Sequence, residues 1–253
     1  MKRSGPLRDR LALRASRSLG VFAWRLGERL GIDVAGATEG PRFTTDPARR
    51  HTFERLIAAA RVGDGTLDGG ACPYPLHELL AHLVAEHGLL LHGSNDAGLE
   101  VLEPQPARDW ATELRAVVAS DDAIWPIFYA VVARDRIDGV FSACTHLGRR
   151  SRLRRFYMFA IGGEPASSAS WTQGAVYALA RAGFRREWGN EWVSAEPVRP
   201  QLRVPVCADD FPLRDAVIGL SSPEAFRRVR HHLRAAKGSG ATPRPMRLWQ
   251  RKT

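Results

Sequence analysis

Three short blocks of the sequence place chemically active side chains beside apolar runs. The first is LLLHGS at 89–94, the second is AVVASDDAIWPIFYA at 116–130, and the third, at 189–206, carries Glu191 at the start of an apolar strand. The first block ends in a histidine, a glycine and a serine, and the second holds two aspartates and an aromatic cluster. Imidazole, hydroxyl and carboxylate groups are the side chains that hydrogen-bond and transfer protons in active sites. Together, the three blocks suggest a nucleotide site.

Each block also has a simpler explanation when it is taken alone. A histidine, glycine and serine at 92–94 are common at the turn after a strand, and a lone Glu191 is more often a charge at a strand edge. The aromatic residues Trp125, Phe128 and Tyr129 are equally expected in an ordinary core. The argument for a site therefore depends on the order and spacing of the blocks.

Familiar catalytic motifs are missing from the sequence. His77 and His82 resemble a zinc-protease helix, but they are five residues apart where that motif needs four, so they cannot meet one ion as i, i+4 ligands. We expect His82 and Glu86 to form an exposed i, i+4 pair. The chain also has no GxSxG elbow, no GxxxxGK[ST] loop and no GxGxxG after a strand.

Short apolar runs separated by Gly, Pro and polar turns dominate the chain from Leu89 onward. Their length predicts strands in a largely antiparallel β core. The run at 175–180 is equally compatible with a helix, because it is rich in alanine. The predicted strands lie at 89–92, 116–119, 137–143, 155–161, 175–180, 191–195 and 202–206.

Helix signals flank these strands. Pro73 and Pro75 precede an apolar stripe that ends at Gly88, which predicts a helix over 76–88. Asp121 or Asp122 is expected to cap a second helix that runs to about Ala133.

Helices are also expected near both ends of the chain. The spacing of apolar residues predicts an amphipathic basic helix over 19–30, and Gly31–Arg50 looks like a linker. Ser222 and Pro223 begin a further helix that Gly238 ends, and 239–253 is expected to be disordered.

The formal net charge of +10 belongs to the two ends of the chain. Residues 1–30 carry eight Lys and Arg against two acidic residues, and residues 225–253 carry nine against none, which leaves 31–224 at −5. Weak polyanion binding by these ends and a solvated basic tail both remain open, and we favour the tail. The basicity therefore belongs to the ends of the chain and not to the middle, where we expect the catalytic residues.

Cysteine usage and hydropathy indicate a protein that is not exported. Cys72, Cys144 and Cys207 are widely spaced and include no CxxC pair, so neither a disulfide framework nor a thiolate zinc site is indicated. The apolar run Leu19–Trp24 is too short for a signal peptide core or a membrane span. We expect a cytoplasmic protein with no membrane span.

The three blocks resemble the ADP-ribosyltransferase superfamily, and its poly(ADP-ribose) polymerase-like branch in particular. The matching residues read LHGS at 91–94, VVASD at 117–121 and NEWVS at 190–194, followed by PVR at 197–199 and LRVPV at 202–206. The third match is the most specific, because it continues without a gap to Val206. The resemblance covers roughly Leu89 to Val206.

The resemblance implies a fold and a domain organisation. It implies an α+β fold with an ADP-ribosyltransferase-like core of mostly antiparallel strands, split into two sheets, with flanking helices. We place this domain at 51–220, between a basic helix and linker at 1–50 and a basic helix and disordered tail at 221–253. His92 and Glu191 are then expected on neighbouring central strands and in one cleft. Side chains on opposite faces of the sheet would overturn the functional interpretation.

The resemblance also implies NAD as substrate and a role for each residue. Glu191 is expected to hold the nicotinamide ribose and to stabilise the positive charge that develops as the glycosidic bond breaks. His92 and Ser94 are expected to bind the adenosine ribose, and the backbone of Gly93 the nicotinamide carboxamide. Phe128, with Tyr129 beside it, is expected to stack on the nicotinamide. ADP-ribose would pass to an acceptor or to water.

The chain departs from the family at one position. Val117, or Val118 if the register shifts by one, stands where active members usually carry a tyrosine that stacks on nicotinamide. Losing that ring removes about 1 kcal/mol of stacking. The sequence therefore also supports a catalytically inactive ligand- or nucleic-acid-binding module with the same fold. RNA 2′-phosphotransferase-like chemistry is a third alternative, which we rank last because Arg152, Arg154 and Arg155 form the only dense basic cluster in the core.

Overall fold

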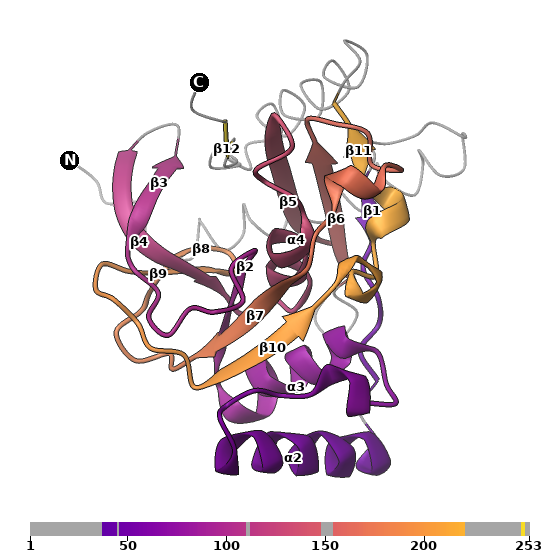
Figure 1. Ribbon diagram of the computed structural model, residues 1–253, viewed down its shortest axis with the longest axis vertical. Helices are drawn as coiled ribbons and strands as arrows, with labels where there is room; N and C mark the ends of the chain where they lie inside the picture. Colours follow the sequence, from indigo (N-terminus) through magenta and orange to yellow (C-terminus); the bar gives the residue numbers. More distant parts are fainter. Residues whose placement is uncertain (1–36, 45, 110–111, 148–153, 221–248, 251–253) are drawn as a thin grey trace, which may run out of the picture.

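The computed structural model describes residues 37–44, 46–109, 112–147, 154–220 and 249–250. In these residues the chain is a mixed α/β protein with mostly antiparallel strands in two sheets and three helices (Figure 1). This confirms the expected α+β class and the two-sheet core. The expected helices at 19–30 and 222–238 lie outside the described residues.

The larger sheet has seven strands and contains all three chemically active blocks. Every pairing in it is antiparallel. Its order is β10 (Leu202–Val206), β7 (Gly174–Leu179), β2 (Leu90–Ser94), β4 (Thr112–Ser120), β9 (Glu191–Ser194) and β8 (Arg185–Trp188), with β3 (Gln105–Asp109) paired to β4.

The smaller sheet is built around one long antiparallel pair, β5 (Gly139–Leu147) and β6 (Arg154–Ile161). The short strands β1 (Thr38–Glu39) and β11 (Ile218–Gly219) both pair with β6, the latter in parallel. Strand β12 (Trp249–Gln250) pairs with β5, although it falls in the segment that we expected to be disordered.

All seven apolar runs predicted as strands are strands in the structure. The ambiguous run at 175–180 forms β7, in which all six residues from Gly174 to Leu179 are buried. A strand buried on both faces loses the alternation of polar and apolar residues, which explains its helix-like composition. The strands that the sequence did not predict are β1, β3, β8, β11 and β12.

Two helices pack against one another along one end of the molecule (Figure 1). Helix α2 (Pro47–Val62) begins after Asp46, whose side chain accepts a hydrogen bond from the backbone N–H of Arg49 at 2.9 Å. Residues 47–50, which we expected within a linker, therefore form its first turn. Helix α3 (Leu76–His87) ends at Gly88, whose φ of 64° is the left-handed conformation that favours glycine.

Helix α4 (Ile124–Val131) confirms the expected helix after the two aspartates, and Asp122 is the residue that caps it. The helix lies directly against the larger sheet because the facing strands carry glycine there. A Cβ on Gly93 would lie 1.9 Å from the carbonyl oxygen of Pro126, and one on Gly174 would lie 2.2 Å from that of Ala130. No other residue type fits this approach of helix and strand backbones.

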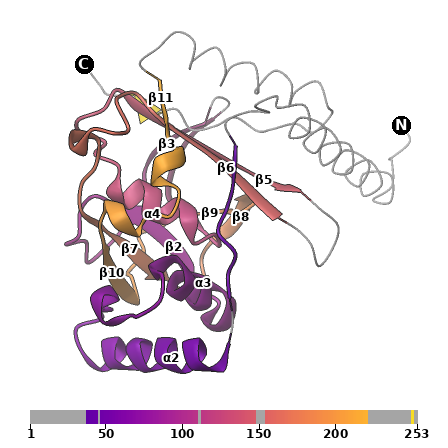
Figure 2. The same ribbon diagram turned by 90° about the vertical axis from the view of Figure 1, so that its right-hand side faces the viewer.

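The main hydrophobic core fills the space between the two sheets and the helices. Phe128 of α4 packs against Phe159 of β6, with ring centroids 4.5 Å apart, so α4 lies between the sheets (Figure 2). A second, smaller core cluster lies on the other face of the larger sheet. It contains Leu90, Leu102, Val117, Ala119, Ala175, Tyr177 and Leu179.

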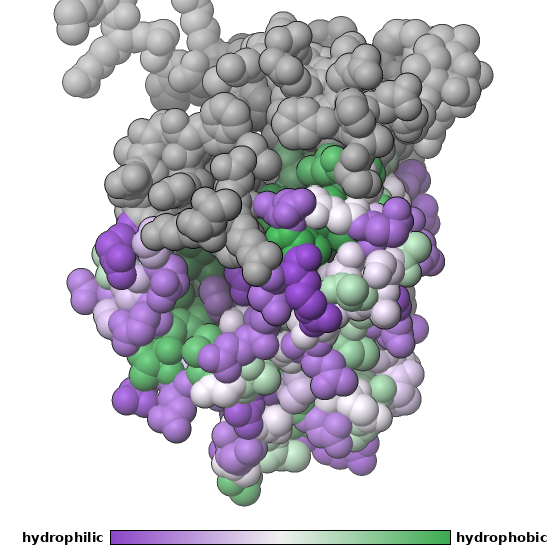
Figure 3. All heavy atoms as spheres, turned by 45° about the horizontal axis from the view of Figure 1, so that its top comes forward, coloured by the Kyte–Doolittle hydropathy of each residue, from purple (hydrophilic) through white to green (hydrophobic). Residues whose placement is uncertain are grey.

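The surface of the described residues is mostly polar. Phe43 and Val62 are the exposed large apolar side chains of this part of the chain. On the face drawn in Figure 3, hydrophilic residues predominate and apolar residues gather in a few small areas. No described helix combines the length and the apolarity needed to cross a membrane.

Candidate functional site

The fold places the three chemically active blocks on adjacent strands. His92, Gly93 and Ser94 end β2, Val117 lies in β4, and Glu191 begins β9. Strand β4 lies between the other two (Figure 1). We expected the strands that carry His92 and Glu191 to be direct neighbours. Strand β4, which belongs to the second block, separates them instead.

The larger sheet opens between β2 and β4. In the described residues these strands pair at Leu91 and Ser120 alone, and the pairs that would continue this register, His92 with Ala119 and Gly93 with Val118, are absent. The imidazole of His92 bridges the opening instead, with Nδ1 2.6 Å from the carbonyl oxygen of Val118. Because a carbonyl can only accept a hydrogen bond, Nδ1 carries the hydrogen and donates it. The neutral ring then has its acceptor lone pair on Nε2.

Cross-strand pairing places His92 and Glu191 on opposite faces of the sheet. Glu191 pairs with Ser120, which pairs with Leu91 of the main core, so these three side chains share one face. His92 follows Leu91 and pairs with Tyr177 of the second core cluster, so its side chain leaves on the other face. The expectation that both residues line one cleft over a single face is therefore wrong.

Gly93 and Ser94 have structural explanations in this fold. Gly93 is needed for the close approach of α4, and Ser94 is buried, with its Oγ accepting the backbone N–H of Asp96 at 3.1 Å. The next residue, Asn95, donates from its side-chain amide to the carbonyls of Ala130 and Val132 at the end of α4. The turn after His92 is therefore fixed to the helix that covers Gly93.

The residues expected to stack on nicotinamide are mostly enclosed by protein. Val117 is 2% exposed and belongs to the second core cluster. Phe128 is fully buried and its ring contacts those of Phe159 and Phe211 in the main core. Tyr129 is half-buried, and its hydroxyl lies 2.9 Å from Oγ of Ser142. Neither Val117 nor Phe128 forms an open wall of a pocket.

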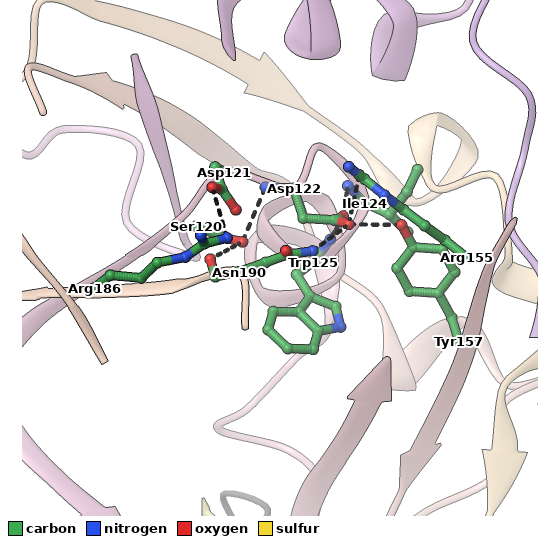
Figure 4. Close-up of polar contacts among 9 residues, drawn as sticks. All are labelled: Ser120, Asp121, Asp122, Ile124, Trp125, Arg155, Tyr157, Arg186 and Asn190. Carbon is green, nitrogen blue, oxygen red and sulfur yellow. Dashed lines mark hydrogen bonds and ion pairs between the residues drawn. The ribbon is translucent and has the colours of Figure 1, made fainter. Parts of the chain in front are cut away.

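A buried carboxylate lies next to the turn that carries Glu191. Asp122 has no solvent exposure, and its Oδ2 accepts hydrogen bonds from Tyr157 at 2.7 Å, from Arg155 at 2.9 Å and from Asn190 at 3.3 Å (Figure 4). Its Oδ1 accepts the backbone N–H of Ile124 at 2.8 Å. This Asp122 cluster joins β4, α4, β6 and the turn before β9.

Burial and charge set the ionisation of the groups around Asp122. Burial raises the pKa of Tyr157 well above its ordinary value, and the Asp122 carboxylate raises it further. Burial alone would lower the pKa of Arg155, but Asp122 outweighs this effect and holds it above the ordinary value. Burial likewise raises the pKa of the nearby Cys144 thiol. The tyrosine thus stays a hydrogen-bond donor and the arginine stays charged.

The turn before Glu191 is held by the same end of β4. The carbonyl of Asn190 accepts a hydrogen bond from Oγ of Ser120 at 2.9 Å, and Arg186 lies 3.5 Å from Oδ2 of Asp121 (Figure 4). Within the described residues, Oδ1 of Asp121 is buried without a hydrogen-bond partner. Glu191 itself is half-buried. The contacts of the preceding turn therefore fix the backbone position of Glu191.

Sequence reasoning missed most of the Asp122 cluster. The helix-capping position identified Asp122, but nothing in the sequence links it to Arg155 or Tyr157, which are more than 30 residues away. The one available signal was the polar end of an otherwise apolar strand at 154–161.

A cleft of about 220 Å³ opens beside this cluster, between β4, β6 and the first two described helices. It is smaller than the usual range for small-molecule sites, about 300–1,000 Å³. Its charged lining consists of Arg49, Arg50, Arg155, Glu78, Glu86 and Asp121. None of the site residues expected from the sequence lines it.

Comparisons with protein-family models, with curated proteins and with solved structures gave no match for this chain. The residues and their geometry are therefore the basis for a functional proposal.

Proposed function

We propose that the protein is an NAD-binding module with an ADP-ribosyltransferase-like fold that does not turn NAD over. The observation that carries the proposal is the opening between β2 and β4, where the backbone ladder stops and His92 bridges the gap. The motif strands β2, β4 and β9 lie side by side in the sheet.

Two observations support binding without turnover. Cleavage of the glycosidic bond needs the carboxylate and the groups that hold NAD to contact one bound molecule. The pairing of β2, β4 and β9 instead directs Glu191 and His92 to opposite faces. The stacking positions are also occupied by core residues, Val117 and Phe128, which leaves no aromatic sandwich for nicotinamide.

A second candidate is an active enzyme in which Glu191 transfers ADP-ribose to an acceptor or hydrolyses NAD. The specific observation in its favour is the fixed position of the turn before Glu191, which Ser120 and Asp122 hold through Asn190. A carboxylate held in place at the site of developing charge stabilises a transition state more than a mobile one does.

Binding and turnover can be measured on the same preparation. We expect calorimetry to show NAD binding that His92→Ala weakens at least about tenfold, because the substitution removes the imidazole that bridges β2 and β4. His92→Asn keeps a donor for the Val118 carbonyl but also lacks Nε2, so it should lose NAD in the same way while remaining folded. The exposed His51 of α2 provides the control, and His51→Ala should bind NAD normally.

Labelled NAD then separates the two candidates. If nicotinamide is released by the wild-type protein and not by Glu191→Gln, the second candidate is correct and the first is wrong. Absence of NAD binding overturns both. Binding to RNA or DNA that weakens steeply with salt would in that case identify a nucleic-acid module.

A further inference from the structure

Three metal-ligating side chains meet on the α2–α3 pair. Nε2 of His82 lies 2.7 Å from Oε1 of Glu54, and Nε2 of His87 lies 3.0 Å from the same oxygen. The ligand atoms of all three side chains lie within 4.8 Å of one another. Glu54 comes from α2 and the two histidines from α3, so the packing of the two helices creates the cluster.

This arrangement differs from the pairs considered in the sequence. His82 is buried and faces Glu54, whereas Glu86 lies 3.8 Å from Arg50, so the expected exposed pair of His82 with Glu86 is wrong. His82 and His87 are five residues apart, but His87 is the last residue of α3 and its ring lies 5.7 Å from that of His82. A carboxylate from the facing helix reaches both rings.

The distances suit a metal ion after a small expansion. Zinc binds imidazole nitrogen at about 2.0–2.1 Å and carboxylate oxygen at about 2.0–2.2 Å, so its tetrahedral ligands are about 3.3 Å from one another. The separations of 2.7 and 3.0 Å from Glu54 are shorter than this by about 0.6 and 0.3 Å, and the ligand atoms of the two histidines lie within 4.8 Å of each other. Glu54 has an exposed side chain on a surface helix and can withdraw by that amount.

Burial and charge also suit a cation. The side chain of His82 is only 4% exposed, while that of Glu54 is 46% exposed, so one side of the cluster is enclosed and the other is open to water. The cluster thus offers a carboxylate anion, two imidazoles and room for a water ligand.

Arg61 is a neighbouring group that opposes a cation. Its NH2 lies 3.3 Å from Nδ1 of His87, so it donates to that nitrogen and keeps the hydrogen of the neutral ring on Nε2. Metal binding requires the opposite tautomer, with Nε2 unprotonated. Arg61 is exposed near the end of α2, and its side chain can turn away into solvent.

We propose that Glu54, His82 and His87 bind a divalent transition-metal ion of the zinc class, with water completing the coordination. Two imidazoles and one carboxylate suit zinc and its neighbours, whereas magnesium and calcium prefer oxygen ligands alone. The ion joins α2 to α3. Because it binds the folded state and not the unfolded chain, it stabilises the folded protein. This site shares no residue with the proposed NAD site.

Calorimetry with zinc chloride on the full chain without an affinity tag tests the proposal. Glu54→Gln and His87→Ala should each weaken zinc binding at least about tenfold, and both positions are open enough to tolerate the change. Arg61→Gln should strengthen binding, because it removes the competing donor and a positive charge. His51→Ala, an exposed histidine on the same helix, is the matched control and should leave the zinc affinity unchanged.

Thermal unfolding gives a second readout. Zinc should raise the Tm of the wild type and of His51→Ala, and should leave the Tm of Glu54→Gln unchanged. The proposal is overturned if zinc does not bind, or if Glu54→Gln and His87→Ala bind it as tightly as the wild type. Equal affinity for magnesium would overturn the assignment to the zinc class.

Discussion

Nδ1 of His92 donates a hydrogen bond to the carbonyl oxygen of Val118 across the opening of the larger sheet, over 2.6 Å. The side chain thereby replaces the backbone rung that is missing between β2 and β4. The imidazole thus provides the Val118 carbonyl with a hydrogen-bond donor at the point where the backbone pairing stops. Strands β2 and β4 are therefore joined at this point by a side chain rather than by a backbone hydrogen bond.

Replacing this imidazole with an apolar group should destabilise the protein. His92→Leu leaves the Val118 carbonyl without its donor, so we expect the free energy of unfolding to fall by about 1–3 kcal/mol. His92→Asn retains a donor and should lose less. Urea denaturation of both variants measures the difference; equal losses would show that the hydrogen bond does not contribute to stability.

Gly93→Ala should be among the most damaging small substitutions in the chain. The added Cβ would lie 1.9 Å from a backbone oxygen of α4, which cannot turn aside. We expect a loss of about 3 kcal/mol or more, at the upper end of the usual cost of overpacking. Gly98→Ala is the control, since its Cβ would meet only Oδ1 of Asp96 at 3.4 Å. A Tm for Gly93→Ala close to that of Gly98→Ala would contradict the observed packing of α4.

Asp122→Asn should destabilise the protein by about 3 kcal/mol, because it leaves a largely enclosed arginine without its counter-charge. The amide also brings a second donor toward Arg155 and Tyr157, which are donors themselves. Asp135→Asn is the matched control, since Asp135 is exposed and pairs only loosely with Arg136; its effect should stay within about 0.5 kcal/mol. Chemical denaturation measures both, and similar values would exclude a structural role for the Asp122 cluster.

Stability should fall as the pH decreases below about 6.5, the ordinary pKa of histidine. His77 is buried against Phe43, and this burial lowers its pKa despite the opposing charge of Glu78. His77 therefore binds a proton at a higher pH in the unfolded chain than in the folded one. Its contribution to the free energy of unfolding is complete above the ordinary pKa and is lost as the pH drops through the lowered pKa. His77→Gln should reduce the fall in unfolding free energy between pH 7.5 and 5, whereas His51→Gln should not. An unchanged slope in His77→Gln would show that another group is responsible.

The sequence predicted the regular parts of the fold better than the site. Apolar runs and helix caps depend on neighbouring residues, which is why seven of the strands, α3 and the cap of α4 at Asp122 were predicted. The register of three strands decides on which face of the sheet the side chains of His92 and Glu191 lie. That register is set by packing between distant segments. The partners of Asp122 and of His82 likewise come from other elements, so no local pattern could reveal them.

The Asp122 cluster also has a consequence for folding kinetics. Its side-chain bonds to Arg155, Tyr157 and Asn190 span 33, 35 and 68 residues. Closing loops of that length costs entropy before any bond can form, so these contacts are expected to form after the transition state for folding. Interactions absent from the transition state slow unfolding without accelerating folding. A single buried carboxylate thus governs how long the native state persists more than how quickly it is reached.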